Sequence, residues 1–220
     1  MLDVVESFVS INGEGMKAGQ LAFFLRLKGC NLCCSYCDTM WANENDCKYK
    51  KREINEIYSE IKATGMANVT ITGGEPLNRE GIYELLELLS KDDTLEVEIE
   101  TNGSIYLGAF MDMDNRPSMT MDYKLPSSNM EQKMCCDNFD LLDMRDTVKF
   151  VSGSVEDLDR ARQIIMQYKL IGKCNILFSP VFGKIDPVDI VEYMKKYRLN
   201  HTAVQLQLHK YIWQPDKRGV

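Results

Sequence analysis

Segments with strand composition alternate with segments of helical spacing along most of this chain. The strand-like runs occupy residues 4–10, 20–27, 68–72, 95–100, 119–123, 148–151, 175–178 and 203–208. Apolar residues recur at helical spacing over residues 53–64, 82–89, 155–168 and 187–197. Such alternation builds βαβ units around a mainly parallel sheet. About six units are too few to close an eight-stranded barrel, so we expect an α/β fold whose mostly parallel strands form a partial, TIM-like barrel.

Polar motifs come directly after most of the expected strands. They follow Leu27, Thr72, Glu100, Tyr123, Phe178 and Leu208. Parallel α/β folds bind their ligands at the carboxyl ends of the strands, because those ends meet at one edge of the sheet. We therefore expect these motifs to surround a single site.

Length and composition restrict the classes of function. The 220 residues are 45% hydrophobic and 27% charged, which suits one domain that we expect to span residues 1–220. A formal net charge of −7 disfavours direct nucleic-acid binding, because phosphate contacts need clustered Lys and Arg. No apolar run is long enough to span a membrane, and the first residues lack the character of a signal peptide. We therefore expect a cytoplasmic protein.

The most informative motif is a short cysteine-rich loop. Cys30, Cys34 and Cys37 have the spacing C-x3-C-x2-C, and cysteine thiolates are the usual ligands of iron–sulfur clusters. A cluster held by three cysteines leaves one iron free to bind another ligand. Cys33 gives the alternative spacing C-x2-C-x3-C, which a zinc site could use, but we expect it to fill the loop. No role is predicted for Cys47, Cys135, Cys136 or Cys174.

A second motif suits a ligand for that free iron. S-adenosylmethionine (AdoMet) carries both an amino and a carboxylate group with which to chelate it. The bare backbone of Gly73 and Gly74 permits close approach, and Glu75 is placed to receive an ammonium. Asn102 is a candidate for a ribose hydroxyl. Taken alone, both motifs are also typical of ordinary turns.

These two motifs resemble the radical AdoMet superfamily, and a narrower resemblance extends over nearly the whole chain. Its further motifs are Ser10–Gly15, Arg26 before the cysteine loop, Cys37-Asp38-Thr39, Thr72–Pro76, Pro126-Ser127-Ser128, Gln207–Lys210 and Arg218-Gly219-Val220. Together they resemble the 7-carboxy-7-deazaguanine synthase family. Asn12 departs from that pattern, since a glutamine is expected there.

The resemblance implies a carbon–nitrogen lyase of queuosine-type deazapurine biosynthesis. The substrate would be 6-carboxy-5,6,7,8-tetrahydropterin, converted to 7-carboxy-7-deazaguanine with loss of ammonia. The implied cofactors are a [4Fe–4S] cluster, AdoMet and Mg²⁺. The implied partners are a flavodoxin or ferredoxin as reductant and a second copy of the chain in a homodimer.

The resemblance also implies a role for individual residues. Cys30, Cys34 and Cys37 would hold the cluster, and the Thr39 hydroxyl would bind Mg²⁺. The residues expected to bind the pterin are Ile11, Asn12, Gly13, Glu14, Arg26, Thr72, His209 and Val220. Those expected around AdoMet are Tyr36, Cys37, Asp38, Gly73, Gly74, Glu75, Asn102, Asp122, Tyr123, Lys124 and Ser179.

Simpler structural roles stay open for several of these residues. Arg26 near a strand end is often part of a surface ion pair, and His209 is nearly as often a packed structural residue. Thr39 would be an ordinary loop hydroxyl without the resemblance, and Val220 would lie in a frayed tail.

Two other functions fit parts of the pattern. A glycyl-radical-enzyme activase also combines C-x3-C-x2-C with a small radical AdoMet domain, but it acts on a protein. A non-catalytic iron–sulfur sensor or binding module would use the cysteine loop without cleaving AdoMet.

Overall fold

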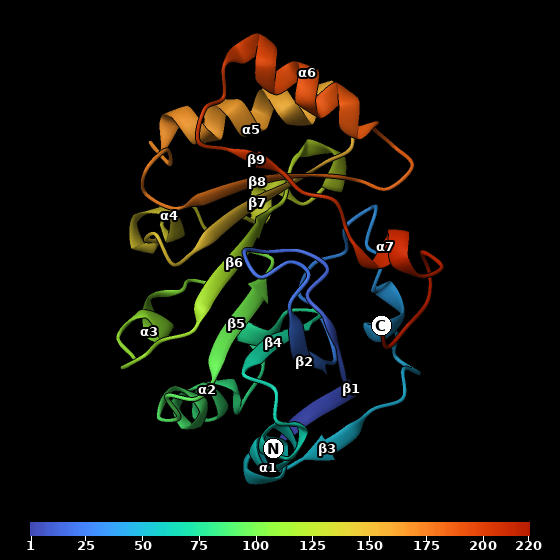
Figure 1. Cartoon of the computed structure of the whole chain (residues 1–220), viewed down its shortest axis with the longest axis vertical. Helices are drawn as coiled ribbons and strands as arrows, with labels where there is room; N and C mark the ends of the chain where they lie inside the picture. Colours follow the sequence, from blue (N-terminus) through green and yellow to red (C-terminus); the bar gives the residue numbers. More distant parts are fainter.

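One sheet of nine strands organises the computed structural model, which describes residues 1–220 (Figure 1). Its strand order is β3-β1-β2-β4-β5-β6-β7-β8-β9. The strands are β1 (Leu2–Ile11), β2 (Leu21–Leu27), β3 (Lys50–Arg52), β4 (Asn68–Gly73), β5 (Glu96–Thr101), β6 (Ser118–Tyr123), β7 (Thr147–Ser152), β8 (Asn175–Pro180) and β9 (Ala203–Val204). β1 pairs antiparallel with β2 and β3, whereas all neighbours from β2 to β9 are parallel. The sheet is open, and the expected partial barrel is confirmed.

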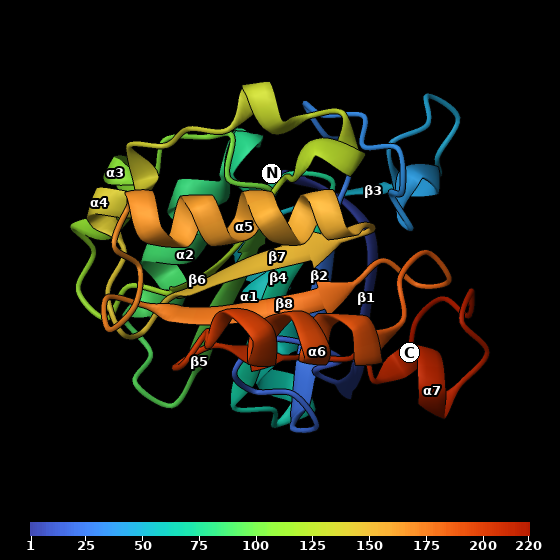
Figure 2. The same ribbon diagram turned by 90° about the horizontal axis from the view of Figure 1, so that it is seen from above.

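The longer helices cover the outer face of the curved sheet (Figure 1). They are α1 (Ile54–Thr64), α2 (Ile82–Ser90), α5 (Val155–Gln167) and α6 (Pro187–Tyr197). In Figure 2, α5 and α6 lie over β7 and β8. Strand residues that alternate toward these helices, such as Ile71, Ile99 and Phe150, are fully buried in the hydrophobic core.

Local signals in the sequence explain where three of these helices begin or end. The Ser154 hydroxyl accepts a hydrogen bond from the Asp157 amide at 3.2 Å and so caps the N-terminus of α5. Gly65 ends α1 with a φ of 69°, a left-handed conformation that favours glycine. Pro187 is the first residue of α6, as predicted.

The remaining elements are short, and the sequence patterns did not show them. They are the α-helical turns α3 (Gly108–Met111), α4 (Asn138–Leu141) and α7 (His209–Ile212), and the 3-10 turns η1 (Met40–Ala42), η2 (Pro76–Asn78), η3 (Pro126–Ser128) and η4 (Glu131–Lys133). None of the helices has the length and hydrophobicity that a membrane span requires.

The prediction of a last strand over residues 203–208 was wrong beyond Val204. The chain leaves β8 after the Gln205 amide donates to the Phe178 carbonyl at 2.8 Å. After Gln205 the chain forms hydrogen bonds with the loop between β1 and β2 instead of with β8. The Leu208 amide donates to the Gly13 carbonyl at 3.0 Å. This β1–β2 loop, residues 12–20, therefore lies across the open side of the barrel, where a closed barrel would have paired strands.

One buried ion pair, between Arg116 and Asp146, holds the amino-terminal ends of β6 and β7 together. The Asp146 carboxylate accepts hydrogen bonds from both terminal nitrogens of Arg116, at 2.8 and 2.7 Å. It also accepts the amides of Met119 and Asp143, each at 2.9 Å. Asp146 is fully buried. Arg116 also donates to the Pro117 carbonyl at 2.9 Å and lies 3.0 Å from Asp143, but the Met119 and Asp143 amides depend on Asp146.

We expect Asp146→Ala to lower the free energy of unfolding by about 3–5 kcal/mol, because the buried guanidinium loses its bidentate partner and two amides are left unpaired. Urea denaturation measures the change. As control, Glu192→Ala removes the exposed Glu192–Lys195 pair on α6 and should cost less than about 1 kcal/mol. Equal effects of the two substitutions would contradict this account.

Candidate active site

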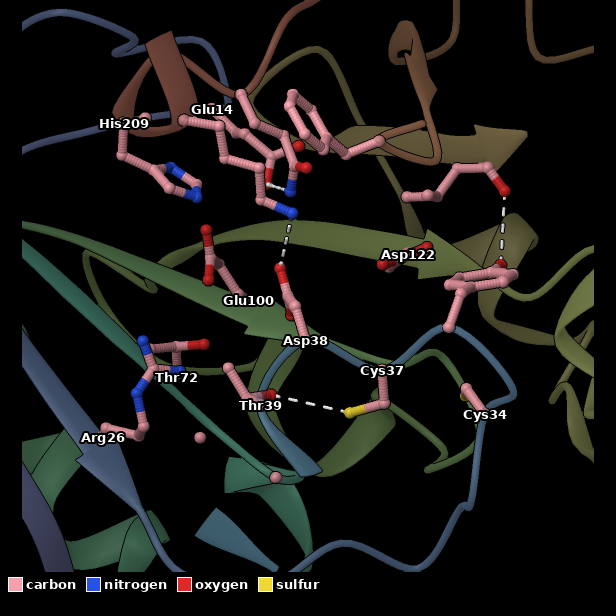
Figure 3. Close-up of a pocket in the computed structure, with 18 of the residues that line it drawn as sticks. Glu14, Arg26, Cys34, Cys37, Asp38, Thr39, Thr72, Glu100, Asp122 and His209 are labelled. Atoms are coloured by element: carbon pink, nitrogen blue, oxygen red, sulfur yellow. Dashed lines mark hydrogen bonds and ion pairs between the residues drawn. The ribbon is translucent and has the colours of Figure 1, made fainter. Parts of the chain in front are cut away.

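A cavity of about 800 Å³ opens at the carboxyl ends of the parallel strands. Figure 3 shows Cys34 and Cys37 on one side of it, with Glu14 and His209 across from them. The predicted site residues that line it are Ile11, Gly13, Glu14, Arg26, Cys30, Cys34, Tyr36, Cys37, Asp38, Thr39, Thr72, Gly73, Gly74, Asn102, Asp122, Lys124, His209 and Val220. Residues from both ends of the chain thus meet at one rim.

Four predicted residues lie behind the cavity wall instead: Asn12, Glu75, Tyr123 and Ser179. Asn12 accepts a hydrogen bond from the Thr70 hydroxyl at 2.7 Å, while its side-chain nitrogen has no partner. The Tyr123 hydroxyl donates to Glu131 at 3.0 Å, away from the cavity. Both residues hold neighbouring segments in place in this structure.

The cysteine loop is positioned by backbone contacts with the turn at Gly73 and Gly74, the double-glycine turn. The Gly74 amide donates to the Leu27 carbonyl at 3.1 Å, and the Glu75 amide donates to the Gly29 carbonyl at 2.9 Å. A Cβ atom on Gly74 would lie 2.2 Å from the Gly29 oxygen. Glycine is therefore required where the two backbones meet, one residue before Cys30.

The three cysteines that line the cavity fit a polynuclear centre. They are partly buried free thiols, whereas Cys33 is exposed and does not line the cavity. No three Cys, His, Asp or Glu side chains converge on a position for a single ion. Burial raises the pKa of the Cys34 thiol to about 11, so positive charge from bound iron would be needed to stabilise its thiolate.

Glu75 is buried behind the cavity wall and holds it in place through hydrogen bonds. Its carboxylate accepts the Thr101 hydroxyl at 2.8 Å, the Asn102 amide at 2.7 Å and the Leu77 amide at 3.0 Å. Burial raises the pKa of Glu75 despite these hydrogen bonds. The side-chain amide of Asn102 in turn donates to Asn31 at 3.0 Å and approaches the Cys30 sulfur at 3.5 Å. Glu75 and Asn102 thus connect β5 to the cysteine loop.

Across the cavity, Glu14 is held by three donors from distant strands and loops. Lys149 Nζ lies 3.3 Å and Gln207 Nε2 lies 3.2 Å from Oε2, while the Ser179 hydroxyl donates to Oε1 at 3.1 Å. Burial alone would raise the pKa of Glu14, but Lys149 and Gln207 outweigh burial and hold it below its ordinary value. Glu14 therefore presents a fixed negative charge to the cavity.

Two further groups in the cavity suit a polar, planar ligand: Arg26, which lies near Thr72, and His209 (Figure 3). Arg26 uses only its Nε to donate to Glu6, at 2.8 Å, which leaves the two terminal nitrogens of its guanidinium for a ligand. The ion pair expected for Arg26 is present, and the side chain lines the cavity as well. Burial lowers the pKa of His209, so its imidazole is neutral at pH 7 and offers one donor and one acceptor.

Thr39 lies between Cys37 on the cysteine side of the cavity and Thr72 and Arg26 on the other side (Figure 3). Its hydroxyl is 3.7 Å from the Cys37 sulfur. Next to it, Asp38 is 3.3 Å from Lys210; burial would raise the pKa of Asp38, but Lys210 lowers it overall. The guanidinium of Arg218 stacks over the Trp41 ring at 4.0 Å, and this contact brings residues 215–220 over the cavity.

Comparison with known proteins places this cavity in a family. The family model of the Radical SAM superfamily matches residues 25–122, which include the cysteine loop and the double-glycine turn. The 7-carboxy-7-deazaguanine synthase of Clostridium acetobutylicum is 58% identical over 217 residues, which cover 99% of this chain and 98% of that protein. This chain belongs to the 7-carboxy-7-deazaguanine synthase family.

Other matches agree with membership of the 7-carboxy-7-deazaguanine synthase family. The enzyme of that name from Chlorobaculum tepidum is 39% identical over all of this chain and 97% of its own length. The crystal structure of QueE from Escherichia coli superposes with a TM-score of 0.74 over 93% of each chain, at 20% sequence identity. This last likeness concerns the fold alone.

Several residues of this 7-carboxy-7-deazaguanine synthase cavity received no role from the sequence. They are Glu100, Lys149, Gln207 and Lys210. A role for Lys149 could have been predicted from the sequence, because it is the only charged residue in the predicted strand 148–151. A buried lysine needs a partner of opposite charge. Glu100 also lines the cavity, one residue before the end of β5. Phe182 and Lys184 also line the cavity, and nothing in their sequence context indicated it.

We expect Lys149→Met to destabilise the protein by about 3–5 kcal/mol at neutral pH, because Glu14 would remain buried without its counter-ion. In that variant, burial dominates and raises the folded-state pKa of Glu14 above its unfolded value. The penalty is therefore largest above the raised pKa and shrinks as the pH falls and the carboxylate is protonated.

Urea denaturation between about pH 7.5 and about pH 5 measures this dependence. The stability deficit of the variant relative to wild type should shrink toward low pH. The control Lys195→Met, on the exposed side of α6, should show a small deficit at every pH. A deficit of Lys149→Met that does not change with pH would show that Glu14 does not depend on Lys149.

Proposed function

We propose that this chain converts 6-carboxy-5,6,7,8-tetrahydropterin to 7-carboxy-7-deazaguanine with loss of ammonia, in queuosine-type deazapurine biosynthesis. The observation that carries the proposal is that one cavity has three cysteines on one side and Glu14, Arg26 and His209 on the other. A small molecule held by the second group would face a cofactor held by the first.

The cysteine side has the residues to hold the cofactors of the family. Cys30, Cys34 and Cys37 would hold a [4Fe–4S] cluster, which with AdoMet supplies radical chemistry when bound. Gly73 and Gly74 expose backbone to the cavity, so AdoMet would meet no side chain there. The further residues proposed for AdoMet are Tyr36, Asp38, Asn102, Asp122 and Lys124 in the wall, with Glu75 and Tyr123 behind it. Ser179 was also expected near AdoMet, but its hydroxyl donates to Glu14 on the opposite side of the cavity.

The opposite side has donors and acceptors for a carboxylated pterin. The free nitrogens of Arg26 suit a carboxylate or ring carbonyl, and the Glu14 carboxylate suits ring N–H groups. Ile11, Gly13, Thr72 and Val220 complete this wall, and Asn12 supports it through Thr70. Thr39 would bind Mg²⁺ together with water and the substrate carboxylate, since Mg²⁺ prefers oxygen ligands.

The size and polarity of the cavity favour this function over the alternatives. A volume of about 800 Å³ lies within the range of small-molecule sites, roughly 300–1,000 Å³. A glycyl-radical-enzyme activase must admit a segment of a protein instead. A non-catalytic sensor has no need of the buried Glu14–Lys149 pair opposite the cysteines.

Further parts of the proposal rest on the family. We propose that residues 1–220 act as one radical AdoMet domain, supported by a hydrophobic core that runs from Leu2 in β1 to Tyr193 in α6. We also propose a homodimer, a flavodoxin or ferredoxin as electron donor, and a cytoplasmic location, which the eight free cysteines support.

After anaerobic reconstitution with iron and sulfide, the protein should convert the carboxytetrahydropterin to 7-carboxy-7-deazaguanine when AdoMet, Mg²⁺ and reductant are supplied. Mass spectrometry identifies the product. Omission of AdoMet or substitution Cys34→Ala should abolish it. AdoMet cleavage without deazapurine would contradict the substrate assignment, and absence of AdoMet cleavage would support a non-catalytic module.

For Thr39→Ala we expect the Mg²⁺ concentration for half-maximal activity to rise roughly tenfold, because an oxygen ligand is lost. Cluster content, measured by iron analysis, should stay unchanged. The matched control is Thr202→Ala, whose hydroxyl donates to the Leu199 carbonyl outside the cavity. An unchanged Mg²⁺ response in Thr39→Ala would remove Thr39 from the metal site.

A further inference from the structure

Gln205 makes an unusual pair of contacts with the backbone of a single residue. Its side-chain oxygen accepts the Gly15 amide at 2.6 Å, and its side-chain nitrogen donates to the Gly15 carbonyl at 2.8 Å. Its own backbone amide donates to the Phe178 carbonyl of β8 at 2.8 Å. One residue thus connects the last part of the sheet to the β1–β2 loop, 190 positions earlier in the chain.

Gly15 is a demanding position in that loop. Its φ of +79° favours glycine, and a Cβ atom would lie 2.7 Å from the buried Glu98 carboxylate. The Gly15 amide has no hydrogen-bond acceptor other than Gln205. The backbone beside Glu14 is therefore anchored on one side by Gln205 and on the other by the bond from Leu208 to Gly13.

We propose that Gln205 is a positioning residue that clamps the β1–β2 loop across the open side of the barrel and so sets the place of Glu14 in the pterin side of the cavity. The proposal rests on the proposed function for its substrate. Lys149, Ser179 and Gln207 orient the Glu14 carboxylate, whereas Gln205 fixes the backbone from which that side chain extends. Gln205 itself does not line the cavity.

The substitution Gln205→Glu tests the hydrogen bond that Gln205 donates to the Gly15 carbonyl separately from the one that it accepts from the Gly15 amide. Protonated, the side chain of Gln205→Glu can donate to the Gly15 carbonyl and accept its amide, as the glutamine does. Ionised, it loses the donor and faces the Gly15 oxygen with a negative charge. Position 205 is half-buried and contacts Gly15, the neighbour of the ionised Glu14, so we expect the pKa of the introduced carboxyl group to be raised.

We therefore expect the KM of Gln205→Glu for the pterin to match that of wild type at low pH and to rise to roughly tenfold above it as the pH increases, the effect of one lost hydrogen bond. The ratio of variant to wild-type KM at each pH removes the pH dependence of the enzyme itself. AdoMet cleavage in the absence of pterin should stay unchanged. Gln167→Glu, which adds the same charge at an exposed position of α5, should give a ratio near one throughout.

Hydrogen–deuterium exchange tests the clamp without catalysis. In Gln205→Leu the Gly15 amide loses its acceptor, so the peptide that contains residues 12–20 should exchange faster, while peptides from α5 should not change. A pH-independent KM ratio for Gln205→Glu, or unchanged exchange of residues 12–20 in Gln205→Leu, would overturn the clamp. Failure of wild type to form deazapurine would instead overturn the proposed function, and the exchange result would still decide the clamp.

Discussion

The buried ion pair of Glu14 and Lys149 is the contact on which the arrangement of this site depends. An open sheet that ends at the two-residue strand β9 has no backbone ladder with which to close. The ion pair instead connects the β1–β2 loop, through Glu14, to β7, through Lys149. Burying two charges is costly unless both are paired and hydrogen-bonded. The additional donors from Ser179 and Gln207 meet this requirement. The contact that completes the barrel therefore also forms one wall of the cavity.

The polarity of the barrel interior explains why a cavity remains there. In closed barrels, layers of branched apolar side chains usually fill the centre. Here the inward positions of neighbouring strands are polar, namely Thr72, Glu100, Asp122 and Lys149, and the apolar positions face the helices. Hydrophobic packing lies mainly on the outer face of the sheet, while the stacked rings of Phe8 and Phe24 line the cavity from β1 and β2. Hydrogen-bonding groups are left around an open space that suits polar ligands.

The sequence predicted the features that depend on local pattern and on parallel topology. Alternating strands and helices indicated the partial barrel, and motifs at successive strand ends indicated a shared rim, because parallel strands end at the same edge. The pattern did not predict contacts between distant segments. Ser179 donates to Glu14 from 165 residues away, and Glu75 turned out to be enclosed by Thr101 and Asn102. The last strand was predicted too long for the same reason: β9 ends at Val204, and the Gln205 side chain bonds to Gly15 in the distant β1–β2 loop.

A double-mutant cycle of Glu14→Gln and Lys149→Met on the free energy of unfolding tests most directly whether this ion pair completes the barrel. Lys149→Met leaves the buried Glu14 carboxylate without its counter-ion, and Glu14→Gln leaves Lys149 with Asp122 alone, at 3.9 Å. The double variant leaves neither charge. We predict that the double variant is more stable than the sum of the single effects implies, by about 2 kcal/mol or more, within the range for residues in one network. Additive effects, within about 0.5 kcal/mol, would show that the two side chains act independently and would contradict this account.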